Sequence, residues 1–285
     1  MQLNDALRAI AQQFDLPADE LIAYAAEDTH DGWDEGKGSW ISGSVWTVEG
    51  QILYALVRAL KPLDLIEFGT ADGCSATHIA AALKANDSGF LTCIDLNAYA
   101  GRHIPDELRD RLVIKLNTVE RWLREDSQPL GAKGIKVFDF VYEDSEHTIE
   151  TTAAVWSWAT KHVTRGGAVL SHDAVHPAIG HLVKAGIEQS GAQGVRYYPL
   201  DPAPALGATQ TGMGFAVWRQ DEQIKEAPEQ RAEVEQPKRA AKPRKATRKG
   251  KRTTKATERQ PAPDERGPGE AKPETATADT GLPAD

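Results

Sequence analysis

The sequence predicts an α/β fold: a mostly parallel, seven-stranded sheet with helices on both faces and an antiparallel hairpin at its end. Through the middle of the chain, short apolar runs alternate with helical stretches. This rhythm is typical of βαβ units, whose parallel sheet is buried on both faces. The last two apolar runs are joined by a loop rich in proline and glycine, with no helix between them. We therefore expect them to pair as an antiparallel hairpin.

The N-terminal segment, residues 1–46, is interpreted as a helical extension followed by a lid. A first helix is predicted from the helical spacing of Leu3, Leu7, Ile10 and Phe14. Residues 17–20 read Pro-Ala-Asp-Glu and begin a second helix. Residues 31–46 are rich in tryptophan and glycine, including Trp33 and Trp40, which predicts a loop or lid.

The main domain is expected over residues 47–220. Thr47 is predicted to cap a helix that ends before Pro62. The predicted strands are Asp64–Phe68, Phe90–Asp95, Leu112–Leu116, Phe138–Glu143 and Ala168–Ser171, then Val195–Leu200 and Gly214–Arg219 in the hairpin. Helices are predicted near 75–86, 119–125, 148–163 and 177–190. Trp156 and Trp158 are two residues apart on one of these helices, so we expect one in the core and the other partly exposed.

The C-terminal segment, residues 221–285, is predicted to be a disordered tail. It has only three large aliphatic residues and no aromatic residue, so burial cannot offset the entropy of its chain. The overall charge of −9 is also divided unevenly, because this segment carries 15 basic and 13 acidic residues. Residues 237–257 form a basic cluster with no acidic residue, and the preceding body is acidic.

The sequence argues against several classes of protein. No apolar run approaches the roughly 18 residues of a membrane span, and the N-terminus lacks the pattern of a secretory signal. Cys74 and Cys93 are too few for a disulfide framework or a multi-thiolate metal site. We therefore expect a cytoplasmic protein that has no membrane partner.

The end of the first predicted strand is a candidate binding site. It reads Glu67-x-Gly69-x-x-x-Gly73 and leads through Ser75 into a helix. In an open parallel sheet, ligands bind beyond the carboxyl ends of the strands, where a glycine-rich turn lets backbone N–H groups approach them. The spacing differs from Gly-x-Gly-x-x-Gly, which disfavours a pyrophosphate site. The alternative is a tight turn that binds nothing.

The second strand ends in Asp95, a carboxylate placed to accept the two hydroxyls of a ribose. Its alternative role is to cap the next helix. Together with the glycine turn and the terminal hairpin, Asp95 makes the chain from about Trp46 to Arg219 resemble the class I S-adenosylmethionine-dependent methyltransferases, which have a Rossmann-like fold. The resemblance implies S-adenosyl-L-methionine as cofactor. It assigns the methionine part to Glu67, Gly69, Gly73 and Ser75, the ribose to Asp95, and the adenine to Asn117 and Thr118.

The fourth and fifth strands deliver a second set of polar residues. Asp144 and His147 follow the fourth strand, and His172 and Asp173 follow the fifth. Asp144, His172 and Asp173 are candidate ligands of a divalent cation, either magnesium or, because an imidazole is included, manganese. His147 is the candidate general base. In the alternative interpretation, the two aspartates cap the following helices and His147 is structural.

This second set resembles the group that contains macrocin-type sugar O-methyltransferases and cephalosporin-hydroxylase-like proteins. Those proteins read Asp-Gly-Asp-His-Ser-Tyr-Glu, where this chain has residues 144–150, and later Gly-Gly and His-Asp. Ser145 and Ile149 depart from the short string, and His172 departs from the acidic pair that completes the metal site in the better understood members. The resemblance implies metal-assisted methylation of a hydroxyl on a small molecule such as a sugar or a polyketide-like acceptor, with Asp144 and His147 as catalytic residues.

The basic tail suggests other functions. It resembles histone-H1-like extensions, which predicts weak contact with a polyanion or nucleic acid; a tail without a ligand is the alternative. The rival functions are therefore a nucleic-acid-associated methyltransferase, and a catalytically silent Rossmann-like binding protein that the tail tethers. No residue pattern specifies an oligomeric state.

Overall fold

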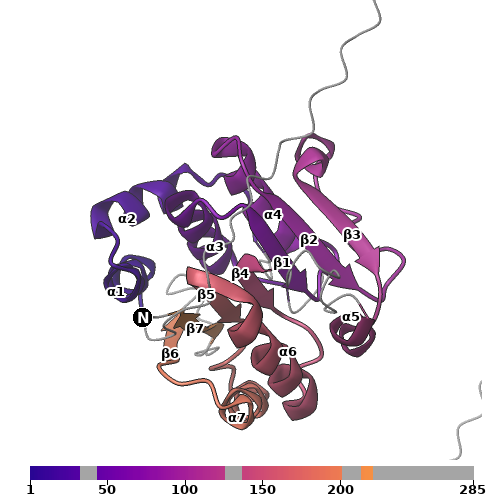
Figure 1. The fold of residues 1–285 in the computed structure, drawn as a ribbon. Coiled ribbons are helices and arrows are strands. Elements are labelled where there is room, and N and C mark those ends of the chain that lie inside the picture. Colours follow the sequence, from indigo (N-terminus) through magenta and orange to yellow (C-terminus); the bar gives the residue numbers. More distant parts are fainter. Residues whose placement is uncertain (33–43, 126–136, 201–212, 221–285) are drawn as a thin grey trace, which may run out of the picture. The chain divides into compact units, whose positions relative to one another are not determined.

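A computed structural model describes residues 1–32, 44–125, 137–200 and 213–220. Its sheet has seven strands in the order β3-β2-β1-β4-β5-β7-β6. The strands are β1 (Asp64–Phe68), β2 (Phe90–Asp95), β3 (Leu112–Leu116), β4 (Phe138–Glu143), β5 (Val163–Ser171), β6 (Arg196–Leu200) and β7 (Met213–Arg219). Strands β1 to β5 pair in parallel, while β7 pairs antiparallel with β5 and β6 (Figure 1). The predicted fold class is confirmed.

Strand β5 is longer than the sequence predicted, because it begins at Val163 rather than at Ala168. Val163 pairs with Phe138, after which the register shifts before Phe140 pairs with Ala168. Gly166 and Gly167 occupy this irregularity. A β-carbon on Gly167 would lie 2.6 Å from the carbonyl oxygen of Asp139, so only glycine fits there. The sequence prediction left residues 164–167 unassigned, between a helix ending near 163 and a strand beginning at Ala168.

Helices cover both faces of the sheet (Figure 1). They are α1 (Leu3–Phe14), α2 (Ala18–Glu27), α3 (Thr47–Leu60), α4 (Cys74–Ala85), α5 (Val119–Glu125), α6 (Ile149–His162) and α7 (Gly180–Ser190), with a short 3₁₀ helix η1 (Asp106–Arg111). Alternate residues of the central strands enter two apolar cores. In β1, Leu65 packs into the core with α1 to α4, and Ile66 packs into the core with α5 to α7. This alternation follows from the two-residue period of a strand.

Trp156 and Trp158 are both buried, with 0% and 8% of their surface exposed, so the expectation that one is partly exposed was wrong. The reason is that α6 packs against α5 and α7 as well as against the sheet. Trp158 contacts the rings of Phe68 and Trp122 edge to face and stacks on His162 at 4.7 Å between ring centroids. Such aromatic contacts stabilise the core beyond simple area burial.

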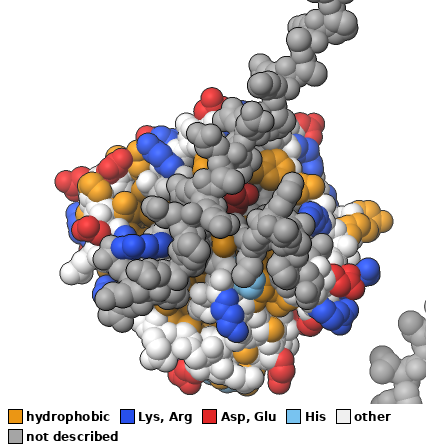
Figure 2. Space-filling model, in the orientation of Figure 1, with side chains coloured by type: hydrophobic (Ala, Val, Ile, Leu, Met, Phe, Trp, Pro, Cys, Tyr) orange, Lys and Arg blue, Asp and Glu red, His pale blue; other side chains and the backbone are white. Residues whose placement is uncertain are grey.

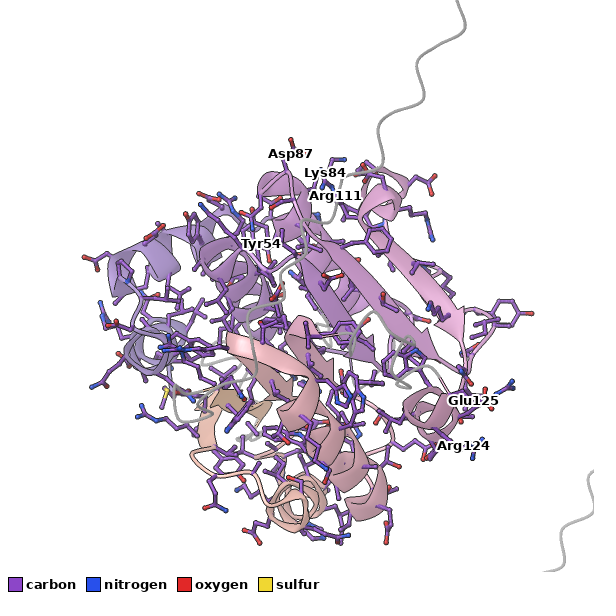
Figure 3. All side chains as sticks on the ribbon, in the orientation of Figure 1. Tyr54, Lys84, Asp87, Arg111, Arg124 and Glu125 are labelled. Atoms are coloured by element: carbon purple, nitrogen blue, oxygen red, sulfur yellow. The ribbon has the colours of Figure 1, made fainter. Side chains whose placement is uncertain are left out.

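The amino ends of β2 and β3 are joined by an ion pair between Asp87 and Arg111, with 2.6 Å between Oδ1 and the guanidinium nitrogen. Figure 3 shows both side chains at the end of α4, beside Lys84. The Lys84 ammonium donates a hydrogen bond to the carbonyl oxygen of Glu107. These contacts lie at the end of the sheet opposite the carboxyl ends of the parallel strands, and so away from the predicted site.

Some expectations concern residues that the structure does not describe. These are the lid tryptophans Trp33 and Trp40, the loop before β7, and the tail 221–285 with its basic cluster 237–257. The described helices include none with the length and apolar character needed to cross a membrane. On the described part of the face in Figure 2, basic and acidic side chains are interspersed. Cytoplasmic location stays a prediction.

Candidate active site

A cavity of about 290 Å³ opens at the carboxyl ends of β1, β2, β3 and β4. Its lining also includes Ser44 and Val45, which precede α3. Many of the residues predicted from sequence line this cavity: Gly69, Ser75, Asp95, Asn117, Thr118, Asp144 and His147. The other predicted site residues, Glu67, Gly73, His172 and Asp173, are buried next to these positions. The strand ends therefore bring together residues from five distant segments of the chain, as an open parallel sheet requires.

The two glycines of the first turn are required by close approaches. Gly69 has a φ of 83°, and a β-carbon there would lie 2.0 Å from the carbonyl oxygen of Asp144. Gly73 has a φ of 99°, and its β-carbon would lie 2.4 Å from Ile104. Any other residue would be strained at both positions. The turn is therefore held tightly between β4 and the segment that follows β2.

Asp95 organises the same turn. Its Oδ2 accepts hydrogen bonds from the backbone N–H groups of Thr70 and Ala71, both at 2.8 Å, and its Oδ1 accepts one from Asn97 at 2.7 Å. A carboxylate has about four acceptor sites, so Asp95 can also accept hydroxyl groups in the cavity. The carboxylate thus shapes the turn in addition to facing the space where the ribose is expected.

Glu67 is fully buried beneath the turn and does not line the cavity. Its two oxygens accept hydrogen bonds from the hydroxyls of Ser75, at 2.6 Å, and Thr70, at 3.0 Å. Burial raises the pKa of the Glu67 carboxyl to about 7. Because the Ser75 proton is donated to Glu67, the Ser75 oxygen meets the cavity as an acceptor. In this geometry it is better placed to accept from an ammonium than to bind a carboxylate.

The second set of residues forms one cluster, comprising Asp144, His147, His172 and Asp173. One potential ligand atom from each lies within 4.8 Å of all the others. Nε2 of His147 is 3.4 Å from Asp144 and 3.5 Å from Asp173, while Nδ1 of His172 is 3.1 Å and 3.6 Å from the same two carboxylates. Around an ion with bonds of about 2.0–2.2 Å, neighbouring ligand atoms are roughly 3.0–3.6 Å apart. The cluster therefore fits a single divalent cation.

The backbone is unusual at two of these residues. His147 has a φ of 53° and Asp173 a φ of 54°. Left-handed conformations are uncommon outside glycine and gather at functional sites, where surrounding structure maintains them. The strain supports a functional role for both residues.

The interpretation of these residues as helix caps does not agree with the structure. Helix α6 is capped by Thr148, which accepts a hydrogen bond from the backbone N–H of Thr151, and α7 begins only at Gly180. Neither aspartate occupies a cap position. Nε2 of His147 and Oδ1 of Asp173 are buried and have no hydrogen-bond partner among the described residues. Such unsatisfied polar atoms are expected where a ligand binds.

The charges in the cluster depend on one another. Burial disfavours ionised Asp144, but His172 and His147 beside it hold the pKa of that carboxyl below its usual range. Burial likewise disfavours charged His172, yet Asp144, Glu49 and Asp173 raise its pKa well above the usual value. The Asp144 carboxylate therefore remains ionised at neutral pH and attracts positive charge.

Glu49 is a site residue that sequence reasoning missed. It lies in the first turn of α3, is fully buried, and places Oε2 3.0 Å from Nε2 of His172. The only signal in the sequence was an acidic residue within an otherwise apolar stretch of a predicted helix. That signal does not reveal the partner, because the contact depends on how α3 packs across the end of β5.

The sheet order, the terminal hairpin and the cavity at the strand ends define a methyltransferase architecture of class I. Residues 66–174, from β1 to just beyond β5, match the family model described as "Methyltransferase domain". This part of the chain is therefore similar to methyltransferase domains. No curated protein sequence matches the chain.

Solved structures are similar to this chain. A putative O-methyltransferase from Klebsiella pneumoniae is 18% identical, with 73% of this chain and 99% of that chain covered and a TM-score of 0.50. An O-methyltransferase from Bacillus cereus in complex with SAH is 16% identical, with coverage of 70% and 88% and a TM-score of 0.49. TomG from Streptomyces achromogenes, an O-methyltransferase in complex with SAM, is 20% identical, with coverage of 75% and 87% and a TM-score of 0.47.

Proposed function

We propose that this protein is an S-adenosylmethionine-dependent O-methyltransferase that uses a divalent cation to methylate a hydroxyl of a small molecule, such as a sugar or a polyketide-like acceptor. One observation carries the proposal. Asp144 and His147 belong both to the cavity at the strand ends and to the cation-binding cluster. A cofactor in the cavity would therefore lie directly beside the groups that activate an acceptor.

The cavity has the polar groups that the cofactor needs. Gly69 and Ser75 lie at the β1 turn, Asp95 at the end of β2, and Asn117 and Thr118 after β3. This order supports methionine, ribose and adenine positions that follow the sheet from β1 toward β3. When bound, S-adenosylmethionine supplies a methyl group on a positively charged sulfur, which makes the methyl carbon electrophilic.

The cluster has the donors that a divalent cation needs. Two carboxylates and two imidazoles suit a cation of borderline hardness, and the described ion pairs of Asp144 and Asp173 are with histidines. When bound, the cation supplies positive charge that lowers the pKa of the acceptor hydroxyl. We assign its binding to Asp144, His172 and Asp173.

His147 is the residue we assign to proton removal. Its ring lines the cavity, whereas the ring of His172 is fully buried and has a carboxylate at each nitrogen. Burial lowers the pKa of His147, but Asp144, Glu143 and Asp173 outweigh this effect and raise it. An imidazole with this charge environment holds the proton that it takes from a hydroxyl.

The direct test is isothermal titration of the full-length protein with S-adenosylmethionine, followed by a methyl-transfer assay on a panel of sugars and polyketide-like alcohols. We expect binding and methylation that excess EDTA abolishes. Absence of binding at high micromolar cofactor would refute the methyltransferase proposal. Activity that survives EDTA would refute the role of the cation but would leave the proposal of methyl transfer standing. Adding nucleic acid to the acceptor panel tests the rival function suggested by the tail.

A further inference from the structure

The ring of His172 is held by a carboxylate from a different part of the chain. Oε2 of Glu49 lies 3.0 Å from Nε2 of His172 and also accepts a hydrogen bond from the backbone N–H of Trp46 at 3.0 Å. Both Glu49 and His172 have 0% of their surface exposed. Because two fixed groups share this oxygen, the start of α3 sets the position of the Glu49 carboxylate.

The two nitrogens of His172 face different carboxylates. Nδ1 lies 3.1 Å from Asp144 and 3.6 Å from Asp173, while Nε2 points to Glu49. Oε2 of Glu49 already accepts a hydrogen bond from the N–H of Trp46, so it meets Nε2 of His172 as an acceptor and takes the bond from the Nε2 proton. Without a cation, Nδ1 can donate its own proton to Asp144 at 3.1 Å; a cation held by Asp144 and Asp173 would replace that proton and bind the Nδ1 lone pair. Histidines that bind metals usually donate their other ring N–H to a carboxylate in this way, which fixes the tautomer and the ring orientation.

We propose that Glu49 is a positioning residue of the cation site: it fixes the tautomer and orientation of His172 so that Nδ1 joins the carboxylates of Asp144 and Asp173. The inference rests on the proposed function, since it takes this cluster to be a cation site. It makes the start of α3, next to the cavity-lining residues Ser44 and Val45, part of that site. The competing role for Glu49 is direct binding through Oε1, which has no hydrogen-bond partner among the described residues.

The experiment compares manganese affinity in the metal-free, full-length protein by isothermal titration. Glu49→Leu removes the acceptor, and we expect it to weaken binding by about 10–100-fold. Glu49→Gln keeps an oxygen acceptor of the same reach, so we expect it to bind close to wild type. Asp87→Asn changes a carboxylate that pairs with Arg111 at the opposite end of the sheet, and we expect it to leave manganese affinity unchanged.

A second readout reports on the ring itself. In the zinc-loaded protein, nitrogen-15 correlation spectra of the imidazoles should show the His172 proton on Nε2 in the wild type and in Glu49→Gln. We expect this signal to be lost or shifted in Glu49→Leu. If Glu49→Leu does not fold, the wild-type and Glu49→Gln spectra decide the question. A His172 proton on Nδ1 in the zinc-loaded wild type overturns the inference.

Other outcomes are equally decisive. A folded Glu49→Leu variant with wild-type manganese affinity overturns the positioning role. A loss in Glu49→Gln as large as that in Asp173→Asn also overturns it, because it would make Glu49 a direct ligand. If the wild-type protein binds neither manganese nor zinc, the cation part of the proposed function falls together with this inference. If it binds them and the Glu49 variants do not differ from it, only the inference falls.

Discussion

Gly69 and Asp144 are in backbone contact at the ends of two neighbouring strands: a β-carbon on Gly69 would lie 2.0 Å from the carbonyl oxygen of Asp144. In addition, the backbone N–H of Asp144 donates to the carbonyl oxygen of Phe68 at 2.8 Å. The turn expected to hold the cofactor and the residue that begins the cation cluster are therefore fixed against each other. In the proposed function, this contact would hold the cofactor's methyl group beside the groups that activate the acceptor.

The contact predicts a large effect of Gly69→Ala. The substitution adds a β-carbon where there is no room and strains a residue with a φ of 83°, so we expect a loss of about 2–4 kcal/mol in the free energy of unfolding. Cofactor affinity should fall as well. Gly194→Ala is the matched control, because Gly194 has a φ of 77° and nothing within 4 Å of an added β-carbon. A similar loss in both variants, measured by urea denaturation, would show that the contact with Asp144 is unimportant.

The raised pKa of the Glu67 carboxyl predicts that the stability of the protein depends on pH. The folded-state pKa of about 7 lies above the ordinary glutamate value of 4.5, so the folded protein binds the extra proton. This contribution to stability is complete below about pH 4.5 and is lost as the pH rises through about 7, amounting to roughly 3 kcal/mol. Glu67→Gln cannot titrate. The stability of the wild type relative to Glu67→Gln should therefore decrease between pH 5 and pH 8 in urea denaturation, and a constant difference would contradict the prediction.

The donor set of the cluster predicts a preference among metals. Sequence reasoning favoured magnesium over manganese, but the structure assembles two imidazoles with two carboxylates, and imidazole favours transition metals. We expect manganese and zinc to bind more tightly than magnesium in isothermal titration. Asp173→Asn keeps a residue that tolerates the left-handed backbone and should weaken manganese binding at least tenfold. Asp87→Asn, at the opposite end of the sheet, should not change it (Figure 3). Equal affinity in both variants would place the cation elsewhere.

If His147 removes the proton from the acceptor, replacing it should lower the rate of methyl transfer and leave cofactor binding unchanged. Asparagine tolerates the backbone conformation at this position, where φ is 53°, but cannot accept a proton from a hydroxyl. With an acceptor from the panel, kcat should fall about 100–10,000-fold in His147→Asn. The exposed His181 on α7 offers a control, since His181→Asn should keep wild-type kcat. Unchanged kcat in His147→Asn would assign proton removal to another group.

Much of the fold was predictable because each strand carries its own local signal. The first four parallel strands were predicted with the observed bounds, since each is a short apolar run followed by a turn or polar residue. The start of β5 was not, because Gly166 and Gly167 resemble a loop when their pairing with β4 is unknown. Strand ends also placed Asp95, Asp144 and Asp173 near the cavity, because parallel strands end on one edge of the sheet.

What could not be predicted depends on packing between distant segments. The contact between Glu49 and His172 joins the first turn of α3 to the end of β5, and no residue spacing encodes it. Similarly, the sequence placed Glu67 near the cofactor, whereas the alternation of β1 directs it beneath the turn toward Ser75 and Thr70. Residue type and strand position were informative, but the direction of each buried carboxylate required the tertiary structure.

The most direct test of the account is a crystal structure of the full-length protein with S-adenosylhomocysteine and manganese, with the metal located by its anomalous scattering. We expect the nucleoside beside Asp95, the sulfur near Gly69, and manganese bound by Asp144, His172 and Asp173. A nucleoside outside the cavity, or manganese bound away from these three residues, would contradict the central claim that cofactor and cation meet at the ends of β1 and β4.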